Sequence, residues 1–107
     1  MAALWPKFSG KLFEKLAVLD SMSKALRDGR LSDELRREAA MVAHKLAGSL
    51  GTFGLAEGSK LAEELESIVQ ADGPLSQAES QRVSELVGSL RKELERFNSA
   101  RREPPAG

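Results

Sequence analysis

His44, the single histidine of the sequence, is the residue whose type and surroundings best suit chemistry. At about 100° per residue on a helix, it points away from an apolar stripe roughly 80° wide. That stripe contains Leu35, Ala39, Val42, Leu46, Leu50 and Phe53. We therefore expect the imidazole to face solvent, between the small residues Ala40, Gly48 and Gly51. Because glycine costs about 1 kcal/mol relative to alanine inside a helix, this small-residue surface indicates that a partner must approach the ring.

The arrangement suits phosphorylation of the imidazole on nitrogen. An exposed imidazole is largely neutral at cytosolic pH, so one ring nitrogen keeps a lone pair that can attack phosphorus. The phosphoryl centre must come in line with that nitrogen, which requires the clearance that small neighbouring residues supply. His44 is therefore the candidate nucleophile and the candidate site of phosphorylation.

Three longer side chains on the same stretch are candidate contacts for a phosphoryl group or a docking partner. Lys45, about 100° from His44, and Arg37, about 20° from it, could attract a phosphorylated acidic site or could be ordinary solvated charges. Met41, about 60° from the histidine, is a candidate apolar contact, although a single exposed methionine often has no such role. The predicted binding set is thus Lys45, Gly48, Arg37, Ala40, Met41 and Gly51.

Other roles for the histidine are less well supported. A core position conflicts with its place opposite the apolar stripe. No metal site is expected, since the chain has no second histidine and no cysteine. Hydrolysis by a nucleophile and base is also not expected, because Ser49 lies about 140° round the helix from His44 and the sequence implies no fixed carboxylate beside the ring.

The elements that must position His44 are four amphipathic helices, since apolar residues recur at spacings of three and four and no stretch alternates as a strand would. The pattern predicts helices over about 7–27, 33–51, 55–71 and 77–100, separated by breaks that contain Gly29, Gly54 and Gly73. Short connections favour an all-α fold, an antiparallel up-and-down four-helix bundle. Residues 1–6 are expected to form a lead-in, 7–100 the bundle, and 101–107 a disordered tail or linker.

Particular residues should shape these helices. The predicted inward-facing residues of the other three helices are Phe8, Leu12, Leu16, Leu19, Met22 and Leu26, then Leu55, Leu61, Ala62, Leu65, Ile68 and Val69, then Val83, Leu86, Val87, Leu90, Leu94 and Phe97. Ser32 or Asp33 should cap the second helix, and Ser76 with Glu79 has the form of a capping box. Gly58 falls on an inward face, which indicates close helix packing.

Composition narrows the classes of partner. The 107 residues fit one domain, and 16 basic and 16 acidic side chains give a net charge of zero, so neither nucleic acid nor a membrane surface is an expected partner. No apolar run approaches the roughly 20 residues that span a bilayer, and no signal-peptide pattern is present. With no cysteine, the chain suits a reducing compartment. We expect a cytoplasmic protein and, by default, a monomer.

The residues around the histidine resemble those of the histidine-containing phosphotransfer (HPt) domains of two-component phosphorelays. The resemblance rests on the segment from Ala43 to Ser49, on Gly51-Thr52-Phe53-Gly54-Leu55, and on Leu61, Leu65 and Glu66. It covers about residues 39–66. Many family members carry a lysine three residues after the histidine, where this chain has Ala47, and Lys45 could supply charge from another direction.

The resemblance implies a phosphoryl carrier in bacterial-type signalling. His44 would accept a phosphoryl group from one receiver-domain aspartate and pass it to another, and Gly48 would leave room for it. The implied partners are response-regulator receiver domains and a histidine kinase or hybrid kinase. The chain would need no cofactor of its own, because Mg²⁺ would sit on the receiver, and it would have no kinase or ATPase activity.

Two alternatives remain open at this point. The same chain could be the phosphorylated domain of a larger histidine kinase or hybrid protein. It could also be a non-catalytic helical adaptor that docks a partner through the face around His44 without any transfer.

Overall fold

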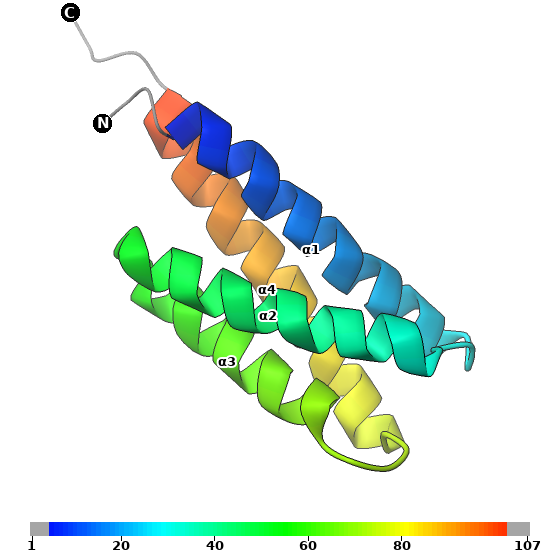
Figure 1. Cartoon of the computed structure of the whole chain (residues 1–107). Helices are drawn as coiled ribbons and strands as arrows, with labels where there is room; N and C mark the ends of the chain where they lie inside the picture. The colour runs from blue at the N-terminus through cyan, green and yellow to red at the C-terminus, as the bar shows by residue number, and fades with distance from the viewer. Residues whose placement is uncertain (1–4, 103–107) are drawn as a thin grey trace, which may run out of the picture.

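The protein folds into four consecutive α-helices. The computed structural model describes the backbone of residues 5–102 and the side chains of residues 10–99. The helices are α1 (Trp5–Arg27), α2 (Asp33–Thr52), α3 (Ala56–Gln70) and α4 (Gln77–Arg102), and no strand occurs within residues 5–102. They run alternately in opposite directions (Figure 1). The predicted fold class, an all-α antiparallel four-helix bundle, is confirmed.

The predicted helix bounds are close to those observed. The first helix begins at Trp5, two residues before the predicted start, and the last continues to Arg102, two residues beyond the predicted end. The middle helices differ from prediction by one residue at their ends. The predicted inward-facing position of the Phe8 side chain, and the predictions for residues 1–4 and 103–107, lie outside the described residues.

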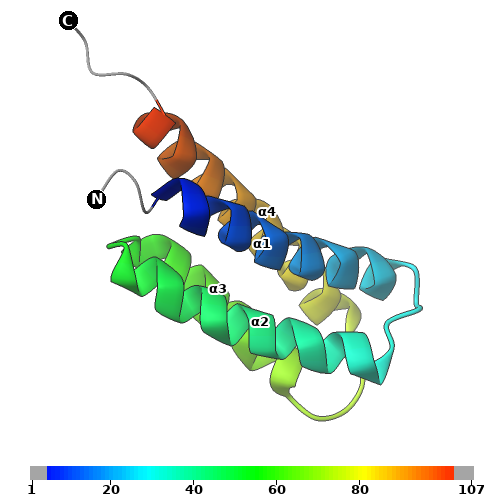
Figure 2. The same cartoon turned by 45° about the horizontal axis from the view of Figure 1, so that its top comes forward.

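The helices form a four-membered ring in which each contacts two others. Within residues 5–102, α1 lies against α2 and α4, α3 lies against α2 and α4, and the backbones of the two diagonal pairs stay farther apart. α2 and α3 pack together most extensively. Figure 2 shows α1 beside α4 and α2 beside α3 as two pairs. None of these helices is both long enough and apolar enough to cross a bilayer.

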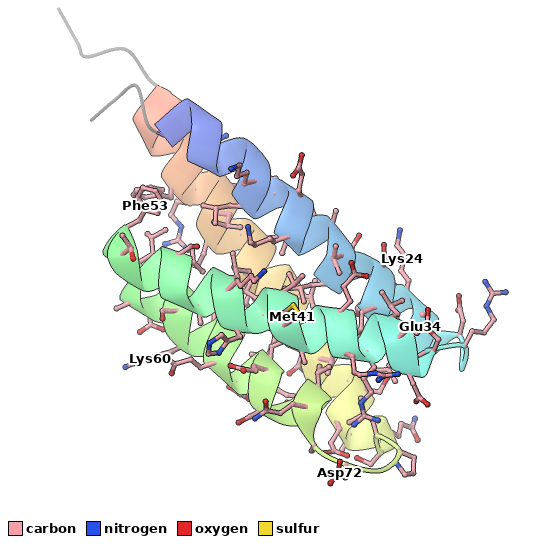
Figure 3. The ribbon with its side chains drawn as sticks, viewed as in Figure 1. Lys24, Glu34, Met41, Phe53, Lys60 and Asp72 are labelled. Atoms are coloured by element: carbon pink, nitrogen blue, oxygen red, sulfur yellow. The ribbon has the colours of Figure 1, made fainter. Side chains whose placement is uncertain are left out.

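The core is built almost entirely from the predicted apolar residues. Those fully buried are Leu12, Leu16, Leu19 and Met22 of α1, Ala39, Ala43, Leu46, Ala47 and Leu50 of α2, Ala62, Leu65 and Val69 of α3, and Val83, Leu86, Val87, Leu90 and Leu94 of α4. The remaining predicted core residues with described side chains are half-buried against this cluster. Phe53 returns to the core from the end of α2 (Figure 3).

The predicted buried stripe of α2 needs one correction. Leu35 and Val42, predicted to be in it, are only half-buried, whereas Ala43 and Ala47, which were left out of it, are buried. The reason is that α2 lies between α1 and α3, so its covered arc extends farther toward α3 than a single stripe suggests. The two side chains on this added part of the arc, Ala43 and Ala47, are small, and α3 can therefore approach closely there.

The starts of α2 and α4 are capped by residues that the sequence indicates. The hydroxyl of Ser32 accepts a hydrogen bond from the backbone N–H of Leu35 at 3.1 Å, so Ser32 rather than Asp33 is the cap of α2. At the start of α4, Ser76 N–H donates to Glu79 Oε1 at 2.9 Å, and Glu79 N–H donates to Ser76 Oγ at 3.1 Å. This is the reciprocal capping box.

The capping box predicts a pH dependence of stability. The hydrogen bond from the Ser76 backbone N–H lowers the pKa of Glu79 below its ordinary value of 4.5. A carboxylate whose pKa falls on folding stabilises the protein above its unfolded pKa and loses that contribution as the pH falls through the folded pKa. We expect wild type to be more stable than Glu79→Gln at pH 7, with the gap closing below about pH 4.5. Urea unfolding at a series of pH values measures it, and a pH-independent gap would contradict the argument.

Close packing of α2 on α3 depends on Gly58. A Cβ atom at this position would lie 3.0 Å from Leu50 Cδ1, whereas one at Gly88 on α4 would meet nothing within 4 Å. We expect Gly58→Leu to lower the free energy of unfolding by about 1–3 kcal/mol through overpacking. Gly88→Leu should raise it by up to about 1 kcal/mol, because leucine is a better helix former. Urea denaturation compares the two, and equal effects would show that α3 does not need glycine.

Candidate functional site

His44 lies in the middle of α2, on the edge that faces α3, and its side chain is 74% exposed. The prediction that the imidazole faces solvent is therefore confirmed. The ring lies at the margin of the covered arc of α2, because the buried Ala47 is only about 60° round the helix from it, whereas the buried Leu46 and Leu50 lie farther round. One edge of the ring nonetheless has a fixed neighbour. Nδ1 lies 3.0 Å from Oε2 and 3.2 Å from Oε1 of Glu66, which belongs to α3.

The Glu66 contact determines which ring nitrogen is free. A carboxylate can only accept a hydrogen bond, so in the neutral ring Nδ1 must carry the hydrogen and donate it to Glu66. The lone pair of the neutral imidazole is then on Nε2. Since the histidine side chain is 74% exposed, this nitrogen is open to an incoming group. The site thus presents Nε2 with a free lone pair, and the Glu66 carboxylate at the other ring nitrogen fixes this tautomer of the imidazole.

The sequence implied no fixed carboxylate beside the ring, and the structure places that of Glu66 there. Glu66 entered only as part of the family pattern, although its side chain is just 21% exposed and contacts His44. A signal was present, because Glu66 follows the buried Ala62 by one helical turn and precedes the buried Val69 by about one. An acidic residue at such a position lies at the margin of a packed face, where it needs a partner.

A shallow hollow of about 330 Å³ lies beside the ring. It is lined by Ala40, Met41, His44, Glu66 and Gln70. The structure therefore brings two of the predicted binding residues, Ala40 and Met41, next to the histidine. Met41 is 60% exposed and lies on the open side of α2 (Figure 3). Gln70 was not singled out from the sequence.

The two glycines of the predicted site differ in their surroundings. A Cβ atom at Gly48 would meet nothing within 4 Å, so the protein itself imposes no steric need for glycine there. At Gly51 the nearest atom would be the hydroxyl oxygen of Ser59, at 3.7 Å. Gly48 therefore contributes open surface one turn after His44, whereas Gly51 lies near α3.

The two predicted cations are exposed and available to a partner. No acidic side chain among residues 10–99 forms an ion pair with Lys45 or Arg37. Arg37 donates only a long hydrogen bond, 3.4 Å, to the carbonyl of Asp33 in its own helix. Neither side chain lines the hollow at His44, and Arg37 lines a neighbouring one of about 420 Å³.

Ala47, where many HPt domains carry lysine, faces α3. The residue is 7% exposed, and its carbonyl accepts a hydrogen bond from the Ser59 hydroxyl at 2.9 Å. A small side chain at this position suits the close contact between the two helices. The two predicted cations, Lys45 and Arg37, lie instead at exposed positions of α2.

We expect Glu66→Ala to alter the tautomer of His44. Without the carboxylate nothing holds the hydrogen on Nδ1, so the fraction of neutral rings with hydrogen on Nε2 should rise severalfold. Imidazole ¹⁵N chemical shifts measure that fraction directly. Glu63→Ala is the matched control, since Glu63 is an exposed glutamate on the same helix. An unchanged ¹⁵N spectrum in Glu66→Ala would show that Glu66 does not set the tautomer.

Comparison with known proteins gives one family and one relative. The family model described as the Hpt domain matches residues 14–100. Protein RcaC from Microchaete diplosiphon is 26% identical over 91 residues, which are 85% of this chain and 14% of RcaC. The chain thus corresponds to a small part of that relative. Among solved structures, none matches it significantly.

Proposed function

The chain belongs to the Hpt domain family, and from this premise we propose that it relays a phosphoryl group through Nε2 of His44 between receiver-domain aspartates. Hpt domains have a phosphotransfer role in two-component phosphorelays, where they interact with histidine kinases and response regulators. The observation that carries the proposal is the contact between Nδ1 of His44 and the Glu66 carboxylate, because it leaves Nε2 as the exposed nucleophile.

The proposed transfer needs no proton movement. The lone pair on Nε2 attacks the phosphorus of an aspartyl phosphate, the N–P bond forms, the P–O bond breaks, and its electron pair leaves on the aspartate carboxylate. The ring then carries hydrogen on Nδ1, phosphorus on Nε2 and a positive charge, which the carboxylate of Glu66 offsets. Transfer to the next receiver reverses these steps, with a carboxylate as nucleophile and Nε2 as leaving group.

The open surface of α2 supports docking of the receiver in this proposal. Gly48 would leave room for the phosphoryl group, and the charges of Lys45 and Arg37, which no acidic side chain among residues 10–99 pairs, would attract the acidic receiver pocket. The exposed Met41 would supply an apolar contact beside the hollow. The receiver would bring its own Mg²⁺ with its acidic residues, so the carrier contributes the nucleophile and the surface.

We expect the purified protein to become labelled when mixed with phosphorylated receiver domains and Mg²⁺, and the label to be acid-labile and base-stable, as for a phosphoramidate. His44→Gln should abolish labelling. Because His44 is exposed, this variant should keep the fold, which circular dichroism and the Tm check.

Binding measurements separate relay from adaptor. If His44→Gln still binds the receiver but accepts no phosphoryl group, the histidine is the relay nucleophile. If the folded wild type binds a receiver and takes no label from any receiver of the panel, the protein acts as an adaptor and the proposal is wrong.

Gly48→Ala should separate stability from transfer. A methyl group has open space at this exposed helix position, so alanine should raise the free energy of unfolding by up to about 1 kcal/mol. The same methyl group would project into the approach of the receiver, so the rate of transfer should fall severalfold. Gly88→Ala is the control, because Gly88 is equally open but lies on α4. It should gain stability without losing transfer, and full activity of Gly48→Ala would contradict the assigned role.

A further inference from the structure

The side chain of Arg36, on α2, donates three hydrogen bonds to the end of α3 and the loop that follows it. Its Nε donates to the carbonyl of Val69 at 2.8 Å, Nη1 to that of Gly73 at 2.6 Å, and Nη2 to that of Ala71 at 2.5 Å. The planar guanidinium thus gathers carbonyls from the last turn of α3 and from the loop that follows. The sequence analysis singled out the neighbouring Arg37, but of the two arginines it is Arg36 that hydrogen-bonds to the end of α3.

This contact supplies what α3 lacks in its own sequence. The last carbonyls of a helix have no partner within the helix and carry a partial negative charge. α3 has no basic residue in its last turn, and the residue before its first turn, Leu55, provides no side-chain cap. Arg36 therefore acts from α2 as the C-terminal cap and counter-charge of α3.

A second tie between the two helices lies toward the other end. The Ser59 hydroxyl near the start of α3 donates to the Ala47 carbonyl of α2 at 2.9 Å. Glu66 lies between this tie and the Arg36 contact, about 4.5 Å of helix rise before Val69. The Ser59 and Arg36 contacts therefore oppose movement of α3 along α2 on both sides of Glu66.

The register matters because the contact with His44 is short. Each residue of slip along a helix moves a side chain by about 1.5 Å, which is enough to break a hydrogen bond of 3.0–3.2 Å. We propose that Arg36 is a positioning residue for His44, holding the end of α3 so that Glu66 stays on Nδ1 and Nε2 keeps its lone pair. As a statement about phosphoryl transfer, this rests on the proposed function.

The test compares Arg36→Met with two matched controls, each removing one cationic side chain. Arg37→Met removes the adjacent arginine, whose guanidinium makes no hydrogen bond to α3 among residues 10–99 and donates only to the carbonyl of Asp33. Arg82→Met removes a cation that joins α4 to Glu64 of α3, with Nε and Nη2 at 2.6 and 2.8 Å from that carboxylate. Arg82→Met shows how His44 responds when an interhelical contact of α3 is lost on the side that faces α4.

The first readout is the ¹⁵N spectrum of His44, recorded well below the Tm of every variant. We expect Arg36→Met to raise the fraction of rings with hydrogen on Nε2 severalfold, and Arg36→Lys to fall between wild type and Arg36→Met. Both controls should resemble wild type. A wild-type spectrum for Arg36→Met, or an equal change in Arg82→Met, would overturn the proposal.

The second readout is the rate of phosphoryl transfer from a phosphorylated receiver. Arg36→Met should slow transfer roughly tenfold, since small misplacements of reacting groups are costly. In a Glu66→Ala background the same substitution should change the rate by less than about twofold, because Arg36 acts through Glu66. If Arg36→Met slows transfer as much in the Glu66→Ala background as in wild type, Arg36 does not act through Glu66 and is a merely structural residue. Absence of transfer in wild type would contradict the proposed function, while the ¹⁵N arm would still decide the role of Arg36.

Discussion

The close contact between α2 and α3 is the constraint on which the site depends. Gly58 allows Leu50 Cδ1 to lie 3.0 Å from the position that a Cβ would take, and the buried Ala43, Ala47 and Ala62 keep the two helices close together. Side chains of ordinary length can then cross it. Even the short Ser59 hydroxyl reaches a carbonyl of α2. The glutamate that meets His44 does so over the same narrow gap.

The candidate site uses two of the four helices, whereas all four contribute to the core. The residues that surround the imidazole come from α2 and α3, which are adjacent in the chain. α1 and α4 close the core on the opposite side, where the hydroxyls of Ser23 and Ser84 lie 3.1 Å apart and Asp20 meets Arg91 at 3.6 Å. A receiver that docks at His44 would therefore meet a surface whose geometry is set within one helical hairpin, with the other pair acting as its support.

The helices and most of the core follow from the spacing of apolar residues, since a period of three to four residues reports one helix at a time. The exposure of His44 could be predicted for the same reason. The Glu66 contact could not, because it depends on how far α3 is shifted along α2. Contacts between the two helices, such as the hydrogen bonds from Arg36 to the end of α3, are not revealed by the periodicity of either helix. The burial of Ala43 and Ala47 was missed because a helical wheel describes one helix alone and does not show that α2 packs against both α1 and α3.

The even number of helices brings Trp5 and Arg102, the first and last described residues, to the same end of the bundle (Figures 1 and 2). At that end α1 and α4 extend past the tip of the α2–α3 hairpin. Polypeptide attached at either side would leave from this stem and need not cross the face that carries His44. This arrangement suits a unit that is inserted into a longer protein, because the surface around His44 stays accessible from outside.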